Sequence, residues 1–282
     1  MLHKTTRILL LISCALLFLI PASSYSAEQA DQQGLIRRIT PPLAVIKDEI
    51  EKKDAYYFDV FYEPSDVLQG TQTGHWSELT TLFGYIHQNA SAYFSVSQFE
   101  RFDKKDFTAN FGTYINLKDS YVHTEVGFGW MVDYIYRFVS VAEYGHKLYR
   151  TLYWQLGYTY KEYPIYDTHT VYPGLIYYFG DSYMSANWGI GYMESNDTAQ
   201  FGVIKGNFAI TKYLQWNCGV AFGERLYDIN SFDARFEKGF ILFTGFNLNL
   251  YKGINLKLGY SYGEEAPKFI KRSLNFGASV KF

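Results

Sequence analysis

From residue 55 to the end of the chain, large apolar side chains recur at every second position, and the residues between them are small or polar. In LYWQLGYTY, residues 152–160, Leu, Trp, Leu, Tyr and Tyr alternate with Tyr, Gln, Gly and Thr. The segments YMSANWGIGY (183–192), LQWNCGVAFG (214–223) and INLKLGYSY (254–262) repeat this pattern. Because successive side chains of a strand point to opposite faces, the period predicts β-strands with one apolar and one polar face.

The composition of the two faces distinguishes a membrane barrel from a soluble sandwich. The polar face is rich in Gly, Asn, Ser and Tyr and carries few charges, whereas a soluble sheet meets water with Lys, Glu, Thr and Ser. The apolar face is aliphatic in the middle of each segment and aromatic near the ends. This is the girdle pattern of a barrel in lipid, and segments of about ten residues suit tilted membrane strands. We therefore expect the apolar face to contact lipid and the polar face to line a lumen.

Counting these segments predicts an all-β chain, a transmembrane antiparallel up-and-down β-barrel of about 14 strands, with 12 as the alternative if the segments near Tyr56 or Val139 pair poorly. Short turns at 87–90, 117–120, 149–151, 179–182, 211–213 and 251–254 alternate with longer connections at 63–75, 102–106, 133–137, 162–167, 194–198, 223–236 and 263–269. Short periplasmic turns and longer outer loops are typical of outer-membrane barrels. We expect residues 55–282 to form this barrel in the outer membrane of a Gram-negative bacterium.

The first 26 residues have the form of a signal peptide. Lys4 and Arg7 precede the apolar run ILLLISCALLFLI, and the small-x-small step SYS follows at 24–26. A retained membrane anchor is one alternative, but 13 apolar residues fall short of the ~20 that a spanning helix needs. A lipoprotein signal ending at Cys14 is the other alternative.

Residues 27–54 differ from everything that follows them. They are polar, contain Pro41 and Pro42, and place Leu43, Ile46 and Ile50 at helical spacing. The segment is interpreted as a periplasmic linker with a marginal helix, or as a small plug of the lumen.

Charge and cysteine content narrow the partners. With Lys4 and Arg7 removed from the 26 basic residues, 24 remain against 28 acidic residues, a net charge of −4. No basic face stands out, so nucleic acid is not expected as a partner. Cys218 is left without a second cysteine, so an intramolecular disulfide is excluded. Aromatic residues make up 20% of the chain, which is far from the usage of an ordinary soluble enzyme.

The end of the chain, NFGASVKF, carries a spacing that resembles the C-terminal signal read by the outer-membrane assembly machinery. Asn275, Gly277, Val280 and Phe282 supply its polar, glycine, apolar and aromatic positions. A terminal Phe is tolerated if it faces lipid and its strand pairs with the first one, because closure leaves no strand edge. We expect outer-membrane lipid and that assembly machinery as partners.

Several charged residues share the polar phase and are predicted to face the lumen: Asp59, Glu78, His123, Glu125, Lys147, Lys161, Lys205, Lys257, Lys271 and Lys281. They form either a self-neutralising network that braces the interior or a path for a polar or charged glycan, with Tyr114, Tyr153 and Tyr183 as sugar-stacking surfaces. Lumen-phase glycines likewise indicate either curvature and tight Tyr packing or a narrow conduit. Fourteen strands lie between the filled eight-stranded barrel and the open channel of 16.

An enzyme is the second hypothesis, since a lipid hydrolase would place a Ser and an oriented His on the lipid face near the outer rim. His146 and His169 have outward phases, but no Ser sits in a matching phase beside His169. His123 and Glu125 share a face and are two candidate metal ligands. We predict no catalytic residue, metal or cofactor. A third hypothesis is a structural or receptor barrel acting through loop 223–236.

QLGYTYKEYPIYD, residues 155–167, and the order of strands from about Asp59 to Phe282 resemble the YaiO family of outer-membrane barrels. The resemblance implies a membrane barrel linked to surface polysaccharide export. It carries no functional residue over to this chain. Many relatives have a longer periplasmic region with helical repeats, for which residues 27–54 leave no room. The expected function is therefore a conduit or accessory component for export of a surface polysaccharide or other polar solute, with periplasmic export proteins as partners.

Overall fold

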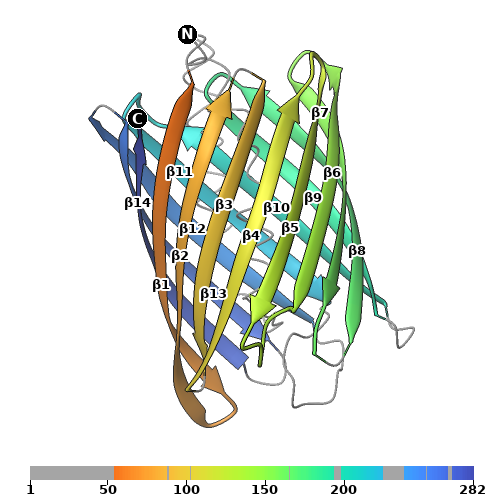
Figure 1. The fold of residues 1–282 in the computed structure, drawn as a ribbon, viewed down its shortest axis with the longest axis vertical. Coiled ribbons are helices and arrows are strands. Elements are labelled where there is room, and N and C mark those ends of the chain that lie inside the picture. Colours follow the sequence, from red (N-terminus) through yellow and green to blue (C-terminus); the bar gives the residue numbers. More distant parts are fainter. Residues whose placement is uncertain are drawn as a thin grey trace, which may run out of the picture.

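The protein folds as one closed antiparallel barrel of fourteen strands in the computed structural model (Figure 1). Each strand pairs with the next along the chain, and β14 pairs with β1 to close the sheet. The predicted 14-strand barrel is confirmed and the 12-strand alternative is wrong. The structure describes residues 54–87, 89–101, 103–164, 166–193, 198–224, 238–251, 253–265 and 269–282. The predicted signal peptide and all but the last residue of segment 27–54 lie outside the described residues.

The strands span 11 to 16 residues, long enough to cross a bilayer at a tilt. Their bounds are β1 Ala55–Gln69, β2 Gln72–His87, β3 Ala90–Arg101, β4 Lys104–Asn116, β5 Ser120–Trp130, β6 Phe138–Tyr149, β7 Leu152–Glu162, β8 Asp167–Phe179, β9 Ser182–Met193, β10 Thr198–Ala209, β11 Leu214–Glu224, β12 Lys238–Tyr251, β13 Ile254–Glu265 and β14 Phe269–Lys281. No helix among these residues is long and apolar enough to cross a membrane.

The outward face carries an aliphatic middle between two belts of aromatic rings. At one end, the rings of Tyr56 and Phe282 stack with centroids 6.1 Å apart. At the other end, Phe107 stacks on Trp130 at 5.8 Å. Exposed aliphatic side chains lie between the belts, among them Val96, Val126, Ile190 and Ile204. Aromatic residues favour the two membrane–water interfaces, so this surface is built for lipid.

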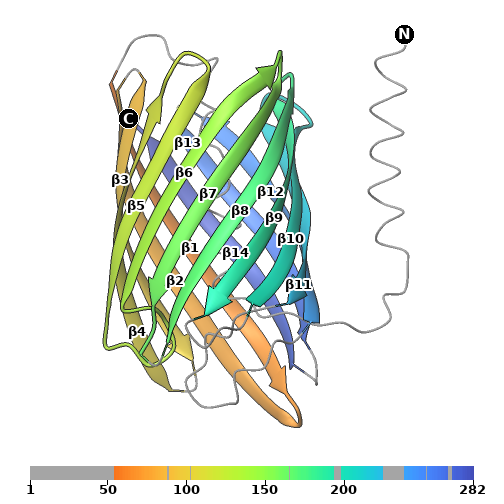
Figure 2. The ribbon, with the colours of Figure 1, turned by 90° about the vertical axis from the view of Figure 1, so that its right-hand side faces the viewer.

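The six turns predicted to be short all lie at one end of the barrel, together with the chain's last residue (Figures 1 and 2). By the rule for such barrels this is the periplasmic end, and the opposite end is extracellular. Two predicted outer loops are wrong, however. Residues 63–75 continue β1 and β2 to a two-residue turn at Gly70, and the β3–β4 connection is as short. Glu63, Ser65 and Val67 continue the alternation, and their side chains are buried. β1 therefore extends through this polar stretch of the sequence.

The closing contact between β14 and its neighbours, here called the seam, is braced on the lumen side. Lys257 on β13 reaches across β14 to pair with Asp59 on β1. Nearer the extracellular end, Nζ of Lys271 on β14 lies 3.0 Å from the carboxylate of Glu63 on β1. The hydroxyl of Ser65 donates to that of Ser273 at 2.9 Å. Complementary side chains thus hold the first and last strands together along the seam.

Lumen glycines lie opposite aromatic rings on the neighbouring strand. At Gly157 a Cβ would lie 2.0 Å from the ring of Tyr172, its direct cross-strand partner, so any side chain would displace the ring. The same arrangement recurs for Tyr57 over Gly84, Tyr93 over Gly112, Tyr121 over Gly145, Phe201 over Gly189 and Phe243 over Gly219. At these six glycines the geometry shows tight aromatic packing.

Candidate functional site: the barrel lumen

The candidate site is the inner wall of the barrel, where every second side chain of each strand meets its counterparts from across the sheet. Its polar members are mostly hydroxyl and amide groups, including Ser91, Ser95, Thr108, Asn110, Gln155, Thr159, Ser185, Asn187, Asn207 and Ser261, all buried. Charged side chains are set among them singly or in pairs. A wall of this kind offers many hydrogen-bonding groups and few isolated charges.

Two of the predicted lumen charges belong to a cluster near the periplasmic end. The hydroxyl of Tyr93 lies 3.0 Å from Nε2 of His123 and also donates to the carboxylate of Glu125. The ring of Tyr114 stacks on His123, with centroids 3.9 Å apart. His123 is 1% exposed. The pair proposed from the spacing therefore meets around a tyrosine hydroxyl. No group of three or more candidate metal ligands occurs among the described residues.

A second polar chain runs across β5, β6, β7 and β9. Tyr121 donates to Glu143 at 2.7 Å and lies 3.2 Å from the side-chain oxygen of Gln155. Gln155 in turn donates to Asn187 at 2.7 Å. The charge of Glu143 acts on Lys205, which is buried on β10. One acid and one base of the lumen are thus close enough for their charges to interact.

The remaining predicted lumen charges are distributed as follows. Glu78 accepts from Thr80 at 2.9 Å, and Lys161 is buried with its ammonium 5.9 Å from the Tyr136 ring. Lys147 lies at the periplasmic rim, 3.9 Å from Asp119. Lys281 is exposed at the same end. Lys257 and Lys271 form ion pairs with Asp59 and Glu63. The structure does not gather the predicted lumen charges into one centre.

Three tyrosines form an aromatic cluster on the lumen wall at the periplasmic mouth. Tyr153 and Tyr178 meet edge to face at 5.4 Å, and Tyr178 lies 6.0 Å from Tyr183. They come from β7, β8 and β9, close to the turns that join these strands. Tyr153 and Tyr183 were predicted as sugar-stacking surfaces, and the structure brings them together around Tyr178. Tyr114 lies apart from them, on His123.

The histidines considered for an enzyme sit among phenols on the outward face. Nδ1 of His169 is 2.7 Å from the hydroxyl of Tyr158, and its ring packs on Tyr160 at 5.1 Å. His146 lies 3.5 Å from the hydroxyl of Tyr144. Both belong to the aromatic belts. In the described part of the chain, the hydrogen bonds and ring contacts of both histidines are with tyrosines, and Ser120 is the cross-strand neighbour of His146.

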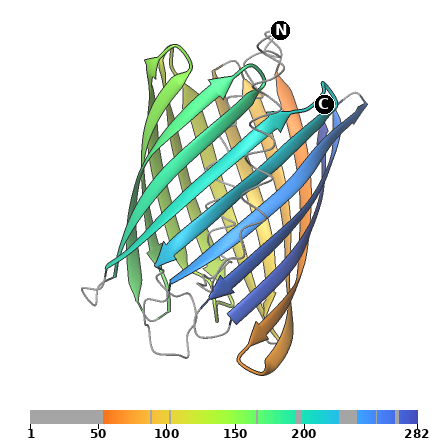
Figure 3. The same cartoon turned by 180° about the vertical axis from the view of Figure 1, so that it is seen from behind.

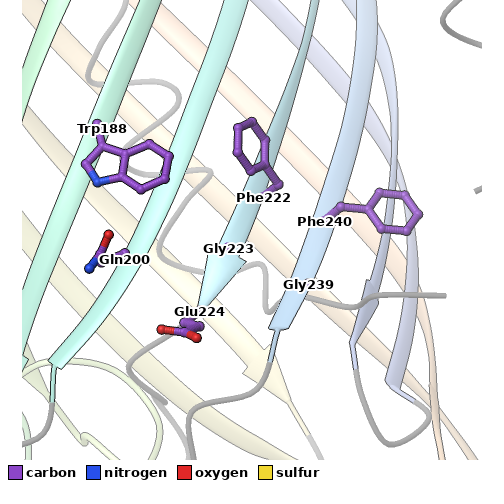
Figure 4. Close-up of a pocket in the computed structure, with 7 residues that line it drawn as sticks. All are labelled: Trp188, Gln200, Phe222, Gly223, Glu224, Gly239 and Phe240. Atoms are coloured by element: carbon purple, nitrogen blue, oxygen red, sulfur yellow. The ribbon is translucent and has the colours of Figure 1, made fainter. Parts of the chain in front are cut away.

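A recess of about 460 Å³ opens at the extracellular end of β9–β12 (Figure 4). Its walls include the outward rings of Trp188, Phe222 and Phe240, with Gln200 and Glu224 beside them. Trp188 is 47% exposed. Because these side chains face lipid, the recess is a feature of the membrane surface and not a part of the lumen.

Several important lumen residues were not predicted from the sequence. Glu63 was assigned to a loop, although its phase continues that of Asp59. Glu143 shares the phase of Lys147 and could have been found by the same alternation. Asp106 was also assigned to a loop, yet it is 2% exposed and accepts three backbone hydrogen bonds.

No family model matches the chain, and no curated protein matches it in sequence. Its fold is similar to a bacterial polysaccharide outer membrane secretin, with TM-score 0.58, 7% identity, and 80% of this chain and 98% of that chain covered. The toluene transporter TbuX of Ralstonia pickettii follows, with TM-score 0.56, 8% identity and 82% and 89% covered. Omp33 of Acinetobacter baumannii has TM-score 0.50, 14% identity and 81% and 99% covered.

These likenesses concern the fold. Together with the closed sheet and its lipid-facing belts, they confirm the predicted outer-membrane β-barrel and its location in the outer membrane of a Gram-negative bacterium. The YaiO family itself stays a prediction.

Proposed function

We propose that the protein is an outer-membrane conduit for a polar solute with little net charge, such as a glycan. The observation that carries this proposal is the character of the lumen wall. It combines the aromatic cluster Tyr153–Tyr178–Tyr183 at the periplasmic mouth with buried hydroxyl and amide groups further along. Sites for small polar molecules pair aromatic surfaces with a few placed hydrogen-bonding groups.

The arrangement of charges on the lumen wall favours an uncharged solute over a charged one. Asp59 and Glu63 are paired with Lys257 and Lys271, and the charge of Glu143 acts on Lys205. Pores that select ions present rings of one sign, whereas this wall alternates both signs. A strongly charged solute would meet attraction and repulsion in turn, while a neutral one loses nothing by passing between paired charges.

Export of a surface polysaccharide is the specific case that the YaiO resemblance suggests. The fold does not choose among solutes, because function resides in the groups that a fold displays. The chemistry of the lumen is therefore the basis for preferring a glycan over an apolar compound. The YaiO resemblance is also the reason for proposing periplasmic export proteins as partners.

The test is conductance of the purified full chain in a planar bilayer, with and without added neutral oligosaccharide. We expect a steady current that the sugar reduces, and a loss of that reduction in Tyr153→Ala. Tyr177→Ala is the matched control, because Tyr177 faces lipid and is 51% exposed. A current that the sugar never alters would contradict the glycan proposal, and the lack of any current from folded protein would contradict a conduit.

Removal of residues 27–54 in the same assay tests the plug interpretation of that segment. A plug predicts a larger current after truncation, and a linker predicts the same current.

A further inference from the structure

The connection between β5 and β6, residues 131–137, folds over the lumen wall at the extracellular end. The carboxylate of Asp106 on β4 accepts the backbone N–H groups of Asp133 at 2.9 Å, Tyr134 at 2.7 Å and Ile135 at 3.1 Å. Hydrogen bonds to an ionised group are about twice as strong as neutral ones. Asp106 has a lumen phase and is buried, so the loop is held inside the rim of the barrel.

A glycine on β5 records the same inward fold independently. A Cβ at Gly129 would lie 2.1 Å from the backbone carbonyl oxygen of Tyr136. The loop backbone thus rests directly on the lumen face of β5, in the space that a side chain would fill. The chain turns into this path at Met131, which has a φ of 56°.

The side chain of Tyr136 occupies the wall beyond this point. Its hydroxyl donates to Asn110 at 3.0 Å, and its ring packs with Val139, Val141 and Tyr163. Tyr166 packs against the same cluster. Tyr163 and Tyr166 belong to the β7–β8 connection, where the N–H of Tyr163 donates to the carbonyl of Tyr166 at 2.9 Å. Two neighbouring connections therefore place three tyrosines over the lumen wall of β4–β7.

We propose that Tyr136 sets the upper size limit of the solute at the extracellular end of the conduit, and that Asp106 is the positioning residue that holds it there. The inference rests on the proposed conduit function. It adds a specificity-determining residue at the opposite end of the lumen from the Tyr153–Tyr178–Tyr183 cluster. The size limit is thus set by a side chain of the β5–β6 connection, which one carboxylate holds in place, and not by the strands themselves.

The first experiment measures which neutral polymers enter the pore, using a graded set of polyethylene glycols and the current that each one blocks. Tyr136→Ala is expected to admit larger polymers than the wild type and to raise single-channel conductance, because its ring is removed from the rim where loop 131–137 folds over the lumen wall. Asp106→Ala is expected to shift the limit in the same direction, and Asp106→Asn, which keeps one acceptor oxygen, to shift it less.

Glu100→Gln is the matched control for Asp106. Glu100 lies at the same rim, and its exposed carboxylate is 3.8 Å from Lys105. A second comparison uses Gly129→Ala, which must displace the loop, and Gly259→Ala, whose Cβ would lie no closer than 3.1 Å to a neighbouring atom. The limit should move in Gly129→Ala and stay in Gly259→Ala and Glu100→Gln.

Hydrogen exchange of the peptide 131–137 separates this inference from the conduit proposal. In the wild type the three amides bonded to Asp106 should exchange slowly, and in Asp106→Ala they should exchange as an open loop. Slow exchange in both proteins would overturn the role of Asp106 whether or not the barrel conducts. If exchange rises but the size limit stays in both Asp106→Ala and Tyr136→Ala, the role of Tyr136 is overturned. A wild type without current would contradict the conduit instead.

Discussion

The seam and the wall opposite to it hold their polar groups in different ways. At the seam, acids and lysines form direct pairs between strands that are far apart in sequence, as for Glu63 and Lys271. On the wall from β3 to β9, the carboxylates of Glu125 and Glu143 accept hydrogen bonds from tyrosine hydroxyls instead. Charge pairs fix which strands lie beside each other, whereas phenols leave flat rings towards the lumen. The charge pairs of the seam thus lie where the last strands meet the first, which Figure 3 shows from behind. Under the conduit proposed above, the opposite wall is the one that would contact the solute.

The largest effect is expected from breaking the buried pair of the seam. Lys271→Ala leaves Glu63, which is 1% exposed, without its cation. Loss of one partner of a buried ion pair costs about 3–5 kcal/mol, so the free energy of unfolding in urea should fall by that order. Current block by sugar should remain in the protein that stays folded. The double variant Glu63→Gln, Lys271→Met should recover most of the stability, and failure to recover it would contradict the account of the pair.

A smaller effect is expected on the opposite wall. Tyr121→Phe keeps the ring over Gly145 but removes the hydroxyl that donates to Glu143. Removing one partner of a buried hydrogen bond costs about 1–3 kcal/mol, which urea unfolding would detect. Unlike the seam variant, this one should also change the sugar-induced block under the proposed conduit, because Tyr121 and Glu143 belong to the lumen wall. An unchanged block would weaken the division between the two regions.

The smallest effect is expected at the periplasmic rim, where both regions end. The hydrogen bond from His87, at 2.5 Å, is the main cause that lowers the pKa of Asp54 below 3.8, with Tyr85 contributing. A lowered carboxyl pKa means stability that is present above pH 3.8 and is lost as the pH falls through the lowered value. His87→Gln should return the pKa of Asp54 towards 3.8 in an NMR titration. No change would show that His87 is not its cause.

Much of this fold could be predicted because the alternation that builds it is local. The alternating positions of Trp154, Leu156 and Tyr158 predict a lipid-facing strand without reference to any other part of the chain. The alternation does not predict a strand where the inward residues are polar and the outward residues are not apolar. The sequence of residues 63–75 predicts a loop for this reason, although the side chains of Glu63 in β1 and Trp76 in β2 are buried on the lumen side.

The candidate site was less predictable, since phase alone says which way a side chain points and not what it meets. Lys257 and Asp59 were both assigned to the lumen, but their pairing depends on the order β1–β14–β13. The role of Asp106 depends on a loop backbone whose path no periodicity encodes. Tyr178 joined Tyr153 and Tyr183 only through the register of β8 with its neighbours.

The seam pairs also bear on the order of events during folding. Their partners are 198 and 208 residues apart in sequence, so neither pair can form until nearly the whole sheet exists. Closing so long a loop carries an entropic cost, and contacts of this kind form late. Until then Glu63 and Lys271 lie on separate strand edges. The pairs therefore stabilise the closed sheet and add nothing to an incomplete one.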